Sequence, residues 1–121
     1  MRDFQTLEIW QKSHSLALSI YEITAKNFPN SELFALTSQL RRAASSIPMN
    51  IAEGCGRKSK KDFAHFIQIA IGSSSEVEYQ LILAKDLKYI NENIWQKLTN
   101  CIIEIRKMIF SFANKLTSHS S

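Results

Sequence analysis

The chain has 121 residues, of which 45% are hydrophobic and 21% charged, proportions typical of one globular domain. Three glycines and two prolines are too few for a turn-rich all-β fold. No apolar run approaches the roughly 18 residues that a membrane-spanning helix needs, so no membrane association is expected.

The formal net charge of +4 is concentrated in one segment. Between Arg41 and Lys61 there are six basic residues and one acidic residue, a local charge of +5, whereas the rest of the chain sums to −1. Such localisation indicates, weakly, a polyanionic partner. The N-terminal sequence has no apolar signal region, and Cys55 and Cys101 are not spaced as metal ligands. We therefore expect reduced thiols in a cytoplasmic protein.

The first apolar pattern of helical period covers about Leu7 to Asn27 and is interrupted by the sequence FPNSE, in which Pro29 ends the helix. A second helix is predicted from near Glu32. Its apolar positions follow steps of three or four residues throughout: Leu33, Leu36, Leu40, Ala44, Ile47, Ile51 and Cys55.

Pro48 lies inside this second pattern without resetting its phase. A proline that ended the helix would usually break the phase, so we predict a kinked but continuous helix. Gly54 and Gly56 are predicted to end it, because glycine readily adopts the left-handed conformation found after helices.

A third helix is predicted to open at Ser59, with Asp62 three residues later, and to end at Tyr89–Ile90. Gly72 in its middle disfavours the helix unless another backbone approaches closely. Asn91 is predicted to cap a fourth helix, which ends near Leu116. Residues 117–121 are predicted to be a flexible tail.

Turns of a few residues join all four predicted helices. Because short connections make successive helices antiparallel neighbours, the sequence predicts an all-α fold. The expected architecture is an up-down-up-down four-helix bundle with a proline-kinked second helix, in a single domain over residues 1–121.

The segment 36–81 is similar to the signature of a bacterial four-helix-bundle family, the 23S rRNA-intervening-sequence protein family. The resemblance implies the same bundle and ring-like homo-oligomers, in some cases pentamers. One related branch has a basic surface that contacts nucleic acid, and the role of the main family is not settled. The runs that carry the resemblance are Arg42-Ala43, Ser46-Ile47-Pro48, Asn50-Ile51-Ala52-Glu53-Gly54, Gly72-Ser73 and Glu76.

On a helical wheel the second helix has a polar seam beside its apolar stripe. The seam has two interpretations: a hydrogen-bonded contact with a neighbouring helix, or a groove for nucleic acid or another subunit. The first interpretation makes Gln39, Ser46, Asn50 and Glu53 structural, and the full seam is Gln39, Arg42, Ser46, Asn50, Glu53 and Arg57.

The run from Arg57 to Lys61 is predicted to lie at a turn, where charge runs are usually just solvated. Lys60 and Lys61 would lie in the electropositive first turn of the third helix, an unfavourable position that a bound phosphate would offset. The nearby Phe63 and Phe66 are expected in the core, so binding would follow backbone charge and not base sequence. The candidate nucleic-acid-binding residues are Arg41, Arg42, Arg57, Lys58, Lys60 and Lys61.

No pattern indicates an enzyme, a cofactor or a metal site. His14, His65 and His119 lie on separate segments, and the chain has no glycine-rich phosphate loop or nucleophile elbow. Our leading hypothesis is a non-enzymatic homo-oligomer that binds nucleic acid by charge, with RNA the expected target by resemblance. The alternative is a self-assembling scaffold that docks a protein partner without binding nucleic acid.

Overall fold

The computed structural model describes residues 3–118, with side chains for 3–116. All regular elements in this range are helical. Two short 3-10 turns, η1 (Phe4–Thr6) and η2 (Asn30–Glu32), flank the first of four long helices. These helices are α1 (Glu8–Asn27), α2 (Leu36–Cys55), α3 (Lys60–Asp86) and α4 (Glu92–Ser118).

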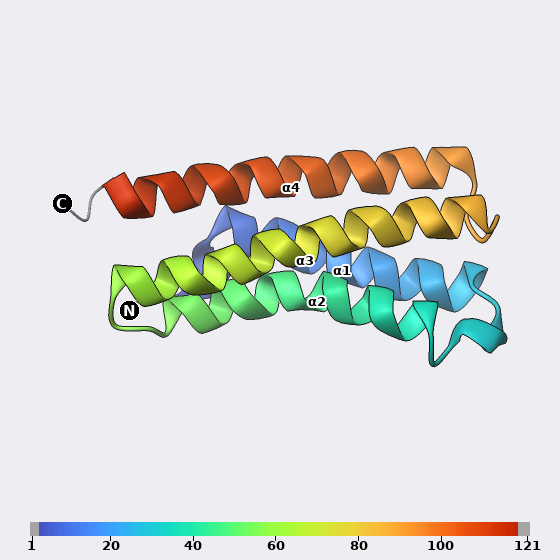
Figure 1. Cartoon of the computed structure of the whole chain (residues 1–121), viewed down its shortest axis with the longest axis horizontal. Coiled ribbons are helices and arrows are strands. Elements are labelled where there is room, and N and C mark those ends of the chain that lie inside the picture. The colour runs from blue at the N-terminus through green and yellow to red at the C-terminus, as the bar shows by residue number, and fades with distance from the viewer. Residues whose placement is uncertain (1–2, 119–121) are drawn as a thin grey trace.

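The four helices form an up-down-up-down bundle (Figure 1). Each helix packs against its neighbour in the chain, and α1 also packs against α4. The described backbones of the diagonal pairs α1–α3 and α2–α4 lie farther apart than those of these neighbouring pairs. The all-α bundle predicted from the apolar periodicity is therefore confirmed. None of the described helices is long and apolar enough to cross a membrane.

The core is formed by the apolar stripes that the sequence predicts. Side chains from all four helices are almost completely buried, and each large aliphatic side chain contributes about 1.5–3 kcal/mol through its removal from water. The largest are Ile20, Leu40, Ile47, Ile51, Ile67, Leu81, Ile102, Ile105 and Ile109.

Helix α2 continues without interruption through Pro48. Pro48 is itself buried, and the residues before and after it, Ile47 and Ile51, keep their places in the core. The hydroxyl of Ser45, near the proline, donates to the carbonyl of Arg42 at 3.2 Å. The predicted continuity of the helix is confirmed, while the bend at Pro48 stays a prediction.

The predicted start of the second helix was wrong by one turn. Residues 30–32 form the separate turn η2, and α2 begins at Leu36, leaving Leu33 44% exposed. Glu32 is the last residue of η2. Its Oε1 accepts the N–H of Leu36 at 3.3 Å, and its Oε2 accepts the hydroxyl of Tyr89 at 2.7 Å. Glu32 therefore satisfies the first turn of α2 from outside the helix.

The predicted left-handed glycines at the end of α2 were also wrong. No described glycine has a positive φ, and Gly56 follows α2 with φ −82° and ψ −5°. Gly54 lies inside α2, where a Cβ would lie 2.6 Å from Cδ1 of Phe63 in α3. Gly54 is therefore required by a close approach between helices, not by its backbone conformation.

The third helix ends at Asp86, before the predicted Tyr89–Ile90. Lys88 takes the left-handed conformation, with φ 68°, and the N–H of Tyr89 donates to the carbonyl of Ala84 at 2.9 Å. This hydrogen bond closes the C-terminus of α3 as a Schellman motif does. The predicted caps at Ser59 and Asn91 are confirmed. Oγ of Ser59 accepts the N–H of Asp62 at 3.0 Å, and Oδ1 of Asn91 accepts the N–H of Ile94 at 2.8 Å.

Two of the residues predicted to form a flexible tail belong to α4, because the helix extends through Ser118. Its apolar period reaches Leu116, which is buried at the end of the bundle. The remaining tail positions, 119–121, include His119 and lie outside the described residues.

The two helix glycines provide a matched test of packing. The Cβ of Gly54→Ala would meet the ring of Phe63, which is buried and packs against Phe112, and overpacking of this kind costs about 1–3 kcal/mol. A Cβ at Gly72 meets nothing within 4 Å, so Gly72→Ala should gain up to about 1 kcal/mol of helix propensity. We expect chemical denaturation to show a lower free energy of unfolding for Gly54→Ala and a higher one for Gly72→Ala.

Loss of stability in Gly72→Ala would contradict this expectation. It would show that another backbone, which only a second molecule could supply, approaches this exposed position.

Candidate nucleic-acid interface

The structure separates the six candidate basic residues into three places. Arg41 packs on α1: its Nε donates to Oγ1 of Thr24 at 2.8 Å, and its guanidinium lies 4.7 Å from the ring centroid of Tyr21. Arg42 is exposed on α2 beside α3. The other four follow the end of α2, about 20 Å along the helix from Arg42. Arg41 therefore has a packing role between α1 and α2.

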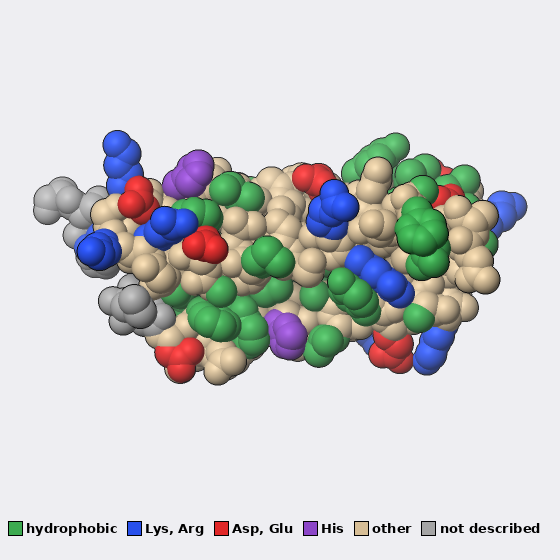
Figure 2. All heavy atoms as spheres, turned by 90° about the horizontal axis from the view of Figure 1, so that it is seen from below, with side chains coloured by type: hydrophobic (Ala, Val, Ile, Leu, Met, Phe, Trp, Pro, Cys, Tyr) green, Lys and Arg blue, Asp and Glu red, His purple; other side chains and the backbone are tan. Residues whose placement is uncertain are grey.

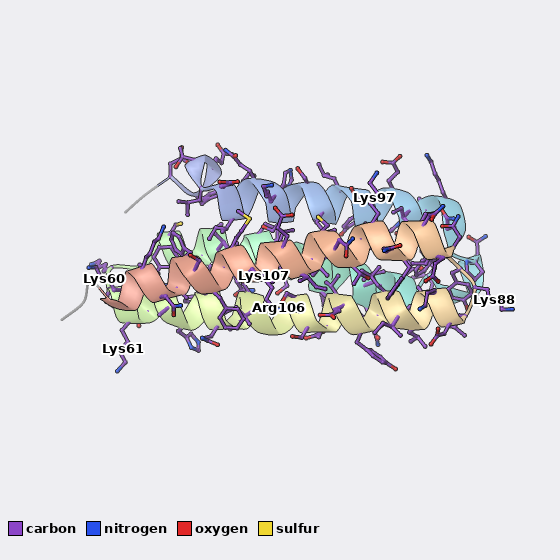
Figure 3. All side chains as sticks on the ribbon, turned by 90° about the horizontal axis from the view of Figure 1, so that it is seen from above. Lys60, Lys61, Lys88, Lys97, Arg106 and Lys107 are labelled. Atoms are coloured by element: carbon purple, nitrogen blue, oxygen red, sulfur yellow. The ribbon has the colours of Figure 1, made fainter. Side chains whose placement is uncertain are left out.

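Arg57, Lys58, Lys60 and Lys61, which we term the basic end, are all exposed where the chain turns from α2 into α3. Figure 3 shows Lys60 and Lys61 at this end of the molecule, with Lys88 at the opposite end. The turn borders a hollow of about 390 Å³, lined by Arg57, Lys58, Ser59 and Lys60 and floored by Cys55, Phe63 and Leu116. Short connections on a packed bundle thus collect positive charge at one end.

Two acidic residues reduce the charge of the basic end. Oε2 of Glu53 lies 3.0 Å from Arg57, and Asp62 occupies the first turn of α3. The N-terminus of α3, with Lys60 and Lys61 in its first turn, adds about half a positive charge from the helix dipole. A net positive potential remains, carried mainly by Lys58, Lys60 and Lys61.

The two aromatic residues predicted for the core differ in their surroundings. Phe63 is buried and its ring lies 5.5 Å from that of Phe112. Phe66 is only partly buried, and the guanidinium of Arg57 lies 4.6 Å from its ring centroid. The prediction of a core position is therefore confirmed for Phe63 and wrong for Phe66, whose ring supports Arg57 at the edge of the basic end.

The centre of the polar seam is bonded to itself and to α3. Oγ of Ser46 lies 2.9 Å from Oγ of Ser73, and Nδ2 of Asn50 donates to the carbonyl of Ser46 at 2.8 Å and to its hydroxyl at 2.9 Å. Toward the two ends of the seam the side chains are exposed: Gln39 and Arg42 at one end, Glu53 and Arg57 at the other. The structural interpretation therefore describes the centre of the seam and leaves its ends open to solvent.

From the serine pair toward Gln39, the seam borders a depression between α2 and α3. A groove along this seam was one of the two interpretations of the sequence, but no residue of α3 was assigned to it. This α2/α3 groove has a volume of about 420 Å³. Its polar lining comes from both helices: Gln39, Arg42 and Ser46 from α2, and Ser73, Glu76 and Gln80 from α3. On α3, positions 73, 76 and 80 follow the steps of three and four that place residues on one flank, a signal that the sequence did contain.

Nothing in the described residues forms a catalytic or metal constellation. No group of three His, Cys, Asp or Glu residues in residues 3–116 could hold a metal ion. The hydrogen bond to Glu32 raises the pKa of Tyr89, and burial, aided by the charge of Glu104, raises the pKa of Cys101. Both groups are thereby held in their neutral forms, away from the basic end.

The comparisons with known proteins agree with the four-helix fold. Residues 5–111 match the family model of the 23S rRNA-intervening sequence protein. The chain belongs to this family.

Among solved structures, this member of the family is similar to a protein of unknown function from the S23 ribosomal protein family of Bacteroides thetaiotaomicron. The two share 28% sequence identity with a TM-score of 0.77, over 87% of this chain and 97% of the other. No curated protein matches the chain.

Four of the residues on which the family resemblance rested come together in the structure. Arg42, Ser46, Ser73 and Glu76 come from two helices and line the same α2/α3 groove. Gly54, from the same set, faces the ring of Phe63 on α3. Pro48 and Ala52, also from the set, line a groove between α1 and α2 instead.

Asn50→Leu tests the structural part of the seam. The substitution removes both hydrogen bonds to Ser46, each with a net contribution of about 0.5–1.5 kcal/mol. We expect the free energy of unfolding to fall by about 1 kcal/mol in a urea titration. The control Glu53→Gln changes an exposed surface ion pair and should stay within about 0.5 kcal/mol of the parent. Equal stability of Asn50→Leu and the parent would contradict the structural role.

Proposed function

We propose that this protein is a non-enzymatic homo-oligomer that binds RNA electrostatically through its basic end. The observation that carries the proposal is the clustering of Arg57, Lys58, Lys60 and Lys61 at one end of the bundle, where the first three line a hollow. The helix N-terminus opening there favours an anion as well. The family description, which refers to ribosomal RNA, supports RNA over DNA as the target.

The chemistry of this end supports contact with the phosphate backbone. Lysine ammonium groups act as point charges toward phosphates and carry no base preference. The partly buried ring of Phe66 nearby is covered by the guanidinium of Arg57. Binding at the basic end should therefore depend strongly on salt and weakly on sequence.

Self-association is supported by two separate sets of exposed hydrophobic side chains. Between α1 and α2, Leu18, Tyr21 and Met49 are 58%, 45% and 63% exposed around an apolar groove of about 310 Å³. On α3, Tyr79 and Ile82 are 61% and 37% exposed. Figure 2, which looks onto the α2 face, shows hydrophobic patches between the charged side chains.

Two unlike apolar surfaces on one subunit suit a head-to-tail contact, in which one surface meets the other on the next molecule. Contacts of this kind close into rings when the rotation between subunits permits. A ring would repeat the basic end in every subunit, so several weak phosphate contacts would add through multivalency. We propose a ring of this type in the cytoplasm, with five subunits as the number that the family resemblance implies.

The alternative function is a scaffold that docks a protein partner and binds no nucleic acid. The α1/α2 groove favours it, because its lining is almost wholly apolar and includes the stacked rings of Trp10 and His14. A groove of this kind suits the apolar face of a partner helix.

Two matched triple variants test the role of the basic end. Lys58/Lys60/Lys61→Gln removes three charges there, and Lys88/Lys97/Lys107→Gln removes three exposed charges elsewhere (Figure 3). In fluorescence anisotropy with a single-stranded RNA of mixed sequence, the first should lose most of its affinity. The slope of its plot of log affinity against log salt concentration should become less negative by up to about 2, since each lost phosphate contact contributes about 0.7 to that slope.

The second triple variant should bind nearly as the parent does, and both should unfold like the parent, since surface substitutions usually stay within about 0.5 kcal/mol. If both variants lost the same amount of RNA affinity, the loss would come from the change in net charge alone, and this result would contradict a site at the basic end. A parent protein that binds no RNA even at low salt would favour the scaffold.

Self-association has its own test. Multi-angle light scattering at micromolar concentration should give a multiple of the 13.9 kDa chain mass. Leu18→Lys/Met49→Lys should lower that mass by placing charge in the apolar groove, whereas Phe34→Lys, at a 93% exposed position outside both surfaces, should not. A parent that elutes as a monomer would contradict the oligomer.

A further inference from the structure

The α2/α3 groove contains a buried acceptor without a donor. Gln80 is only 8% exposed, and among the described residues its Oε1 has no hydrogen-bond partner. Buried polar atoms are normally paired, so such an atom requires an explanation. The oxygen itself has almost no accessible surface, so a ligand in the groove that Gln80 lines would reach it with an N–H or O–H group only once the side chain turns toward the groove.

Two opposite charges lie at the rim of the same groove. Arg42 on α2 and Glu76 on α3 are exposed, and neither takes part in an ion pair within the described residues. Arg42 presents a planar fork of donors, while Glu76 presents two acceptor oxygens. The serine pair Ser46–Ser73 forms a neutral hydroxyl surface beside them.

A ligand that satisfies this set must be polar on two edges. It must offer acceptors to Arg42 and several donors to Glu76 and Gln80. A phosphate offers no donors, and an ammonium group offers no acceptors. The volume of about 420 Å³ falls within the range of small-ligand sites, roughly 300–1,000 Å³.

Guanine matches this arrangement better than the other bases. Its O6 and N7 accept from an arginine fork, and its N1–H and N2–H₂ present three donors on the opposite side. Cytosine has only one amino group to donate to both Glu76 and Gln80. Adenine lacks an oxygen acceptor for Arg42, and uracil has only a single N–H to donate.

We propose that the α2/α3 groove binds a guanine base, with Arg42 donating to its O6/N7 edge and Glu76 and Gln80 accepting from N1–H and N2–H₂. The inference rests on the proposed function, because it supplies the base-reading partner of an RNA held by charge at the basic end. The polar seam connects the two places, since Asn50, Ser46 and Arg42 follow one flank of α2 away from the basic end. Unstacked single-stranded bases are read in this manner, through their Watson–Crick and Hoogsteen edges.

The experiment uses the full-length protein and fluorescein-labelled eight-nucleotide RNAs that differ at one position. Against an all-uridine strand, a strand with one central guanosine should bind about tenfold tighter, the discrimination expected of one well-formed pair of base contacts. A central adenosine should bring no such gain. Inosine, which lacks the 2-amino group, and 7-deazaguanosine, which lacks N7, should each lose part of it.

Two variants assign the preference to the groove. Glu76→Gln and Gln80→Met should abolish the guanosine preference while leaving binding of the all-uridine strand intact. Glu92→Gln removes the same charge as Glu76→Gln from an exposed position on α4, and should keep the preference. This control separates base recognition from the general effect of removing a negative charge.

Failure of the inference and failure of the proposed function are distinguishable. Salt-dependent binding of every strand without a guanosine preference overturns the groove site and leaves the basic end in place. If no strand binds, the proposed function fails, and titration with guanosine monophosphate followed by amide chemical shifts decides the groove: no shifts at Arg42, Glu76 or Gln80 overturn it. A changed oligomeric mass in Glu76→Gln would make the groove a subunit contact and also overturn the proposal.

Discussion

The close approach of α2 and α3 is the constraint on which the rest of the structure depends. At Gly54 the two helices lie so near that any side chain would meet the ring of Phe63. Next to this contact the chain passes from α2 to α3 in four residues, 56–59, so the basic residues do not spread along a loop. The short connection and the packed helices beside it together keep these charges at one end of the bundle.

The same contact sets the position of the polar seam. Because α2 continues through Pro48 in unbroken phase, its polar flank meets the polar flank of α3 at the pair Ser46–Ser73. Toward the basic end the two flanks are joined by Arg57 over Phe66. In the other direction they border the α2/α3 groove, where Oε1 of Gln80 has no hydrogen-bond partner among the described residues. One helix pair thus contributes a charged end, a bonded centre and an open polar groove.

This arrangement gives the two halves of the surface different chemistry. The α2–α3 side carries charge and hydrogen-bonding groups, which suit a polyanion and its bases. The α1–α2 side carries Leu18, Tyr21 and Met49 around an apolar groove, which suits another protein surface. An oligomer that joins the α1–α2 side to Tyr79 and Ile82 on α3 would leave the basic end free, so self-association and phosphate binding are compatible within one bundle.

The sequence by itself determined the fold, because apolar residues at helical spacing must face a common core and short turns make successive helices antiparallel. It also determined the caps at Ser59 and Asn91, which depend on local hydrogen bonds. Contacts between distant segments were decided only by the tertiary structure. The hydrogen bond between Arg41 and Thr24 could not be predicted from local sequence, since 17 residues separate them. The role of Gly54 could not be predicted either, because a glycine needed for its small size looks the same in a sequence as one needed for its backbone conformation. The α2/α3 groove is a further example, because its residues Arg42, Glu76 and Gln80 come together only when α2 and α3 pack. Periodicity predicts the flank of a helix on which a residue lies, but it does not predict which residues of another helix will face that flank.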